Sequence, residues 1–139
     1  MMNLFEKTLS SYKDLPIKAC SEIVFSNGGH LFACQNSISI YVYKFYLPEN
    51  PIIFKAHSSL VSSISWFDDD TGFVSSGIDA NIFVWHLKNE SHTPSWEYKM
   101  KSVTFSCVAT YKPEGSNKPL IYTTGSDKTI RELCEGTTG

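Results

Sequence analysis

Three residues of the types that form a hydrolase triad lie within one short stretch of the 139-residue chain, namely His57, Ser75 and Asp79. A serine hydroxyl beside an imidazole that a carboxylate orients can act as a nucleophile in acyl transfer. This chemistry also needs donors for an oxyanion, and the sequence has no Gly-x-Ser-x-Gly elbow and no glycine-rich stretch placed to supply them. We therefore expect no catalytic residues, and a Ser-His-Asp hydrolase is the less favoured alternative.

The stretch that carries these residues, from Phe54 to Leu87, predicts three antiparallel strands. Runs rich in β-branched and aromatic residues cover 60–67, 73–77 and 81–87. The acidic cluster Asp68-Asp69-Asp70 with Thr71-Gly72 predicts the first turn, and the residues around Asp79 predict the second. The stretch is too short to hold a crossover helix, so the strands are expected to be antiparallel.

A similar pattern precedes this stretch. Three strands are predicted before it, over 22–25, 30–34 and 38–43. A loop over 48–51 and a fourth, outer strand over 51–54 are predicted to follow them. Aligning Tyr41 with Trp85 gives an offset of 44 residues, a period typical of a four-stranded propeller blade. In this alignment Gln35 takes the place of Asp79. For Leu4 to Leu9 the sequence leaves open a strand or a short helix.

A third copy of the pattern follows residues 95–100, which predict another outer strand. Its strands are predicted over 107–111 and 120–124, and 125–130 matches 77–82 at an offset of 48 residues. Thr123 and Asp127 then correspond to Ser75 and Asp79, whereas Leu133 stands in the place of the tryptophan. No histidine precedes its first strand, and no fourth strand is predicted for it.

The spacing of four polar residues resembles that of the WD-repeat family: His57 and Ser75 precede Asp79 by 22 and 4 residues, and Trp85 follows it by 6. The resemblance implies an all-β fold, a partial β-propeller of about three four-stranded WD40-type blades in an incomplete ring. It also implies a structural hydrogen-bonded tetrad of those four residues. We expect a lead-in segment over 1–19 and blades over 20–54, 55–100 and 101–139.

Composition excludes several other classes. Apolar residues make up 42% of the chain, enough for a packed core, and a net charge of −2 with scattered basic residues argues against nucleic-acid binding. No apolar run is long enough to span a bilayer, and the first residues do not resemble a secretory signal. The four cysteines have neither C-x-x-C spacing nor metal-ligand spacing from a histidine, so we expect no metal and no cofactor.

A closer resemblance is carried by residues 15–20, 24–33 and 125–132, which look like the cilia- and flagella-associated WD-repeat proteins. This resemblance implies a non-enzymatic scaffold on the axoneme that docks inner dynein-arm or regulatory-complex components. The expected location is cytoplasmic, in the cilium or flagellum. Two alternatives are a general cytoplasmic WD-repeat adaptor and a chain that associates with further blades or with copies of itself.

Six residues are candidate partner contacts because aromatic and charged side chains in loops and outer strands are prone to exposure: Trp96, Tyr98, Lys99, Asp68, Asp69 and Asp70. The competing interpretation of the two aromatics is packing on a neighbouring strand. The competing interpretation of the three aspartates is a solvated turn. Calcium binding is not favoured, because no further oxygen ligands are apparent near them.

Overall fold

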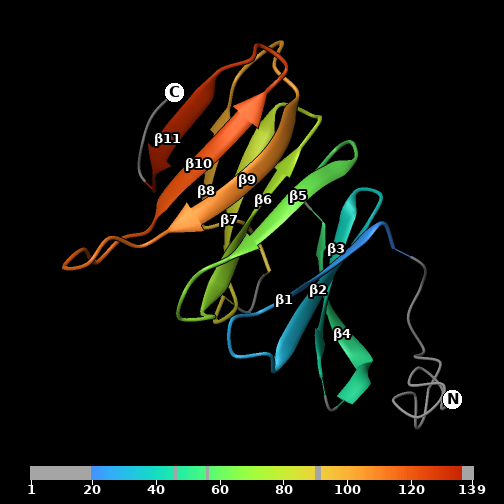
Figure 1. The fold of residues 1–139 in the computed structure, drawn as a ribbon. Helices are drawn as coiled ribbons and strands as arrows, with labels where there is room; N and C mark the ends of the chain where they lie inside the picture. Colours follow the sequence, from blue (N-terminus) through green and yellow to red (C-terminus); the bar gives the residue numbers. More distant parts are fainter. Residues whose placement is uncertain (1–19, 46, 56, 90–91, 136–139) are drawn as a thin grey trace, which may run out of the picture.

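The computed structural model describes residues 20–45, 47–55, 57–89 and 92–135, which form three antiparallel sheets (Figure 1). Sheet 1 has the strand order β1 (Glu22–Phe25), β2 (Leu31–Asn36), β3 (Ser39–Lys44) and β4 (Leu47–Lys55). Sheet 2 has the order β5 (Val61–Trp66), β6 (Gly72–Gly77), β7 (Asn81–His86) and β8 (Trp96–Lys99). Sheet 3 has the order β9 (Phe105–Tyr111), β10 (Leu120–Gly125) and β11 (Ile130–Cys134).

The predicted all-β class is confirmed. The described residues form no helix, and so none that could cross a membrane. The strands are joined by short turns, several of which place a residue other than glycine in the left-handed region, for example Ala80 with φ of 70° and Lys128 with φ of 62°. Such turns reverse the chain within a few residues, which accounts for the antiparallel order.

The three sheets are stacked face to face in chain order and do not close into a ring (Figure 1). One apolar cluster fills the space between sheets 1 and 2 and includes Val42, Phe54, Phe73 and Trp85. A second cluster fills the space between sheets 2 and 3, with Val84, Phe105 and other residues. The central sheet is thus covered on both faces, which agrees with the burial of every residue of β6 and of the four central residues of β7.

The alignment of the first repeat was wrong by two residues. Phe32 pairs with Tyr43 in sheet 1 as Phe73 pairs with Trp85 in sheet 2, so Tyr43 and not Tyr41 stands in the place of the tryptophan. Strand alternation could not reveal the error, because a shift of two residues leaves every side chain on the same face of the sheet. By the same register Gln35 does not stand in the place of Asp79.

The loop predicted over 48–51 is also corrected. This segment belongs to β4, which begins at Leu47 and includes both Pro48 and Pro51. Its pairing with β3 is interrupted by an irregularity between Val42 and Lys44. The prolines are compatible with a strand because β4 is the outer strand of sheet 1, where a missing N–H leaves no ladder bond unmade on the open side. The structural predictions for residues 1–19 lie outside the described residues.

Candidate functional site

The four residues His57, Ser75, Asp79 and Trp85 are joined in one hydrogen-bonded chain. The Nδ1 atom of His57 lies 3.1 and 3.2 Å from the two carboxylate oxygens of Asp79. Its Nε2 atom lies 2.8 Å from the Ser75 hydroxyl, which also accepts the indole N–H of Trp85 at 2.9 Å. The network ties the segment before β5 to β6, β7 and the turn between them.

The protonation states of this network follow from its burial. Burial lowers the pKa of His57, against the opposing influence of the Asp79 carboxylate. A neutral imidazole that donates from Nδ1 to Asp79 can accept the Ser75 hydroxyl proton at Nε2. Burial opposes ionisation of Asp79, but bonds from the Ser58 N–H at 2.8 Å and from His57 outweigh it and lower the Asp79 pKa.

Gly77 lets the imidazole reach the carboxylate. A Cβ at this position would lie 2.5 Å from His57 Nδ1 and 2.6 Å from Asp79 Oδ1, closer than such atoms approach. The end of β6 therefore has to be glycine for the network to keep this geometry. Sequence reasoning did not single out Gly77, although its place two residues before Asp79 was a usable signal.

Sheet 1 carries different residues in the same places. By the strand register, Cys34 corresponds to Ser75, and it packs with Phe32 and Tyr43 on the outer face of the sheet. Cys20 packs against this cluster. Burial raises the pKa of the Cys34 thiol to about 12, and a hydrogen bond with Cys20 adds to the increase. A thiol pair thus occupies the region that the imidazole and the hydroxyl occupy in sheet 2.

The corresponding residues of sheet 3 are not brought together. Thr123 is buried and donates its hydroxyl proton to the carbonyl of Cys107 at 2.9 Å. Asp127 is exposed and forms an ion pair with Arg131, four residues further along the chain. Sheet 3 therefore holds the threonine and the aspartate in two separate contacts that do not join them to each other.

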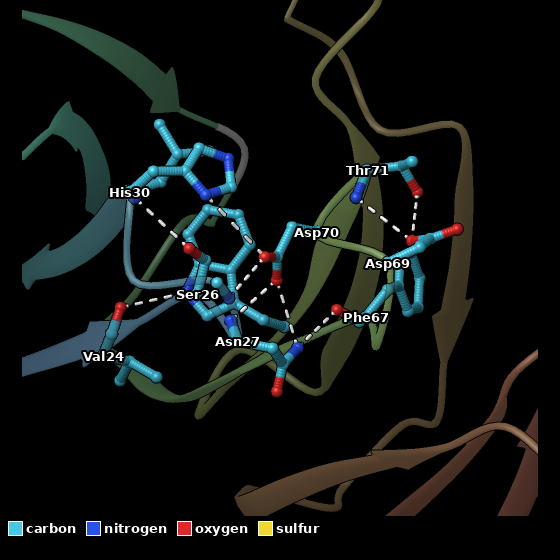
Figure 2. Close-up of polar contacts among 11 residues, drawn as sticks. Val24, Ser26, Asn27, His30, Phe67, Asp69, Asp70 and Thr71 are labelled. Carbon is cyan, nitrogen blue, oxygen red and sulfur yellow. Dashed lines mark hydrogen bonds and ion pairs between the residues drawn. The ribbon is translucent and has the colours of Figure 1, made fainter.

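The acidic turn holds sheet 1 to sheet 2. Asp70 accepts the backbone N–H groups of Asn27 and Gly28, each at 2.7 Å, so that its carboxylate caps the β1–β2 turn (Figure 2). The Asn27 side chain donates to the Phe67 carbonyl at 2.7 Å. Burial opposes ionisation of Asp70, but the backbone donors outweigh it and lower its pKa. Asp70, named above as a partner contact, is therefore engaged within the chain.

The other two aspartates of the cluster remain on the surface. Asp69 is exposed and accepts the hydroxyl and the N–H of Thr71 at 2.7 and 3.1 Å, a local turn contact that Figure 2 shows apart from the inter-sheet bonds. The bonds from Thr71 lower the pKa of Asp69. Asp68 is exposed. These two side chains stay available as partner contacts.

Of the three outer-strand candidates, Tyr98 lies in the core. It is 6% exposed and packs between sheets 2 and 3, so the packing interpretation holds for it. Trp96 is half-buried against the same cluster, with its ring stacked 6.2 Å from that of Tyr98. Lys99 is exposed at the end of β8. Among the outer-strand residues, the partner-contact proposal therefore falls on Lys99 and on the half-buried Trp96.

A shallow cavity of about 150 Å³ lies where sheets 2 and 3 meet. Its lining carries both signs of charge, with Asp68, Asp69 and Glu135 near Lys112 and Lys118. Sequence reasoning did not connect the two aspartates with these lysines, because the residues are far apart in the chain. Within the described ranges no group of three or more His, Cys, Asp or Glu side chains could hold a metal ion.

A family model described as the WD domain, G-beta repeat, matches residues 49–86, which include the whole tetrad. Cilia- and flagella-associated protein 57 of Mus musculus is 33% identical over 135 residues, covering 97% of this chain and 10% of the relative. Cilia- and flagella-associated protein 57 A of Tetrahymena thermophila is 43% identical over 89 residues, covering 63% of this chain and 7% of the relative. The chain thus spans a tenth or less of the length of these relatives.

Among solved structures, the β-propeller domain of Cps50 (Swd1) from Myceliophteria thermophila is similar to this fold with a TM-score of 0.65. The match covers 85% of this chain and 40% of that chain, at 11% sequence identity. At this identity the likeness concerns the fold alone. It supports the interpretation of the three sheets as an open part of a propeller.

Proposed function

We propose that this chain, a WD-repeat chain of stacked propeller-type sheets, is a non-enzymatic protein-interaction scaffold of cilia or flagella. The proposal rests chiefly on three apolar side chains of sheet 1 that are exposed. Ile23 is 54% exposed, Phe25 is 52% exposed and Phe45 is 64% exposed. Apolar side chains that are exposed together on a soluble protein often mark a surface that binds another protein.

The patch is ordered by ring contacts. Phe25 lies 5.4 Å from Phe32 and 6.3 Å from Phe45 between ring centroids. Phe32 in turn stacks on Tyr43 at 5.3 Å. A rigid aromatic surface loses little side-chain entropy when a partner covers it, and such surfaces are enriched in interfaces.

The buried state of the triad-type residues supports a role without catalysis. Ser75 has no exposed surface and His57 is 4% exposed, so a substrate has no path to the hydroxyl. The hydroxyl already contacts both the imidazole and the indole. A stabilising role accounts for each of these contacts, whereas a nucleophile needs an open side for its substrate.

The names of the similar proteins support the ciliary part of the proposal. We extend the proposal to docking of inner dynein-arm or regulatory-complex components on the axoneme. A general cytoplasmic WD-repeat adaptor would share the same fold and the same exposed face. The axonemal scaffold and the general adaptor differ in which partner proteins they should bind.

Capture from an extract of ciliated cells tests the proposal, with the chain as bait and quantitative mass spectrometry as the readout. We expect enrichment of axonemal dynein or regulatory-complex subunits. The matched bait is Phe25→Asp, which places a charge on the exposed apolar face and should lose these subunits. Recovery of chaperones alone, or equal recovery by both baits, would contradict the proposal.

A further inference from the structure

Of the four free cysteines, Cys20 and Cys34 lie together at the start of sheet 1. Cys20 precedes β1 and packs against the buried cluster that contains Cys34, and the two thiols are in hydrogen-bond contact. Ser21, the next residue, donates its N–H to the Gln35 carbonyl at 3.1 Å and holds this segment beside the end of β2. Two thiols in contact on paired segments are the starting geometry for a disulfide.

The thiol pair takes the place of a link that is noncovalent in sheet 2. There, His57 Nε2 lies 2.8 Å from the Ser75 hydroxyl and ties the segment before β5 to β6. By the strand register Cys34 corresponds to Ser75, so its contact with Cys20 ties the segment before β1 to β2. Because sulfur replaces both polar groups, the link in sheet 1 is the one that oxidation can make covalent.

The two thiols differ in their access to solvent. Cys20 is half-buried and lines a cavity of about 390 Å³ between the β2–β3 turn and the start of β5, which has room for molecules of the size of water. Cys34 has no exposed surface, and burial raises the pKa of its thiol to about 12, so it keeps its proton at neutral pH. Since the thiolate is the reactive form of cysteine, a small oxidant should react with Cys20 first.

The other two cysteines cannot form such a bond with each other or with this pair. Cys107 on β9 lies opposite Thr124, and Cys134 on β11 lies opposite Leu120, both on β10. Four residues of a strand span about 13 Å, which is more than a disulfide can bridge. Sheet 2 separates both of them from the pair in sheet 1 (Figure 1). They therefore serve as internal controls for oxidation.

We propose that Cys20 and Cys34 form a reversible disulfide on reaction with hydrogen peroxide, in which Cys20 is the attacking thiol and Cys34 the resolving thiol. The Cys20 sulfur attacks a peroxide oxygen, the O–O bond breaks, and the departing hydroxide takes up the thiol proton as water, which leaves a sulfenic acid. The Cys34 sulfur then attacks the Cys20 sulfur, the S–O bond breaks, and hydroxide departs as water with the Cys34 proton. Each sulfur gives up one electron, and both peroxide oxygens are reduced to water.

The bond would make the stability of sheet 1 respond to oxidant. It closes a loop from Cys20 to Cys34 that contains β1 and the β1–β2 turn. A crosslink of this kind restricts the unfolded chain and so stabilises the folded one. The urea midpoint should therefore rise when the parent chain is oxidised and return when a dithiol reduces it. This inference does not depend on the proposed scaffold function.

Peptide mapping of the oxidised chain locates the bond. The reduced chain is treated with hydrogen peroxide, alkylated, and cut after lysine and after glutamate without reduction. The peptides 19–22 and 23–44 then hold one cysteine each and stay together only through a disulfide. We expect this linked pair, and we expect a dithiol to separate it. Free thiols at both positions while Cys107 or Cys134 is oxidised, or a disulfide between two chains, would overturn the proposal.

The variant Cys34→Ser separates the two roles. It keeps the attacking thiol without the resolving one, so dimedone, which traps sulfenic acids, should label Cys20 in this variant, and most of that label should be lost in the parent chain. Oxidation should not raise the urea midpoint of the variant. The matched control is Cys107→Ser, which should form the linked peptides as the parent chain does. Equal labelling of Cys20 in the parent chain and in Cys34→Ser would overturn the resolving role.

Discussion

Ser75 joins the two halves of the buried network, because its hydroxyl contacts His57 on one side and Trp85 on the other. The serine lies on β6, the second strand of the central sheet, with both faces of that sheet covered. If the Ser75 hydroxyl were removed, a water molecule could take its place only in a cavity large enough to hold it. The network therefore stabilises the central sheet at a place where any unpaired polar atom is costly.

Replacing Ser75 by alanine should lower the free energy of unfolding by about 1–3 kcal/mol, because the imidazole and the indole each lose a buried partner. Urea unfolding followed by tryptophan fluorescence measures the change. The matched control is Ser106→Ala on β9, an exposed serine, with an expected change within about 0.5 kcal/mol. Equal effects of the two substitutions would contradict the stabilising role of the network.

The network should also make stability depend on pH. Burial lowers the pKa of His57 below its ordinary value of 6.5, so the unfolded chain takes up the proton first as the pH falls. The stability that neutral His57 contributes is complete above pH 6.5 and is lost as the pH falls below this value. The lowered pKa of Asp79 causes a further loss of stability below pH 3.8, the ordinary pKa of an aspartate. The urea concentration at the midpoint of unfolding should therefore decrease when the pH is lowered from 7 to about 5.5.

The variant His57→Gln is the control for this pH dependence. It should be less stable than the parent chain at neutral pH, because the glutamine cannot span from Asp79 to Ser75. Its midpoint should then change much less between the two pH values. A parent midpoint that stays constant or rises on acidification would show that His57 does not titrate in this way.

Residue types and spacing were sufficient to name the tetrad, because the distances of His57, Ser75 and Trp85 from Asp79 resemble those of the WD-repeat family. They were insufficient in sheet 1, where Cys34 and Tyr43 take the equivalent places with different chemistry. Tyr41 and Tyr43 both fit an alternating strand, and only the pairing with β2 distinguishes them. Glycine at position 77 is likewise explained only by the approach of His57.

At the scale of elements, turns connect the sheets as much as strands do. The β5–β6 turn caps the β1–β2 turn through Asp70 (Figure 2). The indole of Trp66 donates to the Val24 carbonyl at 2.9 Å. On the other side, the Thr110 hydroxyl donates to the Trp66 carbonyl at 2.8 Å and ties β9 to β5. Each interface thus combines an apolar cluster with a few polar bonds that fix its register.

Replacing Asp70 by alanine should cost about 1–2 kcal/mol, because two backbone N–H groups lose a charged acceptor in a partly exposed place. The loss should be seen as a lower midpoint of urea unfolding and as faster exchange of the Asn27 and Gly28 amides. Asp68→Ala is the matched control, since Asp68 is exposed in the same turn. Equal behaviour of the two variants would mean that the cap does not hold sheet 1.

The sequence predicted the acidic turn but not its contact with the β1–β2 turn. Aspartate, threonine and glycine at 70–72 and asparagine with two glycines at 27–29 are typical of turns in any fold. The bond from Asn27 to Asp70 spans 43 residues, and nothing local in either turn requires it. Contacts of this kind depend on how the sheets stack, which single-strand patterns do not encode.

For the whole molecule, repetition was the informative signal. The recurrence of three-strand patterns predicted an all-β stack, and the structure has three sheets in chain order. The aromatic face of sheet 1 and the uncovered Ile130 of sheet 3 lie at opposite ends of that stack, as Figure 1 shows for β1 and β11. Each end of the described stack thus carries exposed apolar side chains, and the central sheet lies between them.

The most direct test of the central proposal is the location of the tagged chain in living ciliated cells. We expect the chain to be enriched in the cilium over the cell body and to remain with the axoneme after detergent extraction, because bound partners hold it there. The Phe25→Asp chain should be diffuse at the same expression level. A parent chain that is equally diffuse, or fully released by detergent, would contradict the proposal of a ciliary interaction scaffold.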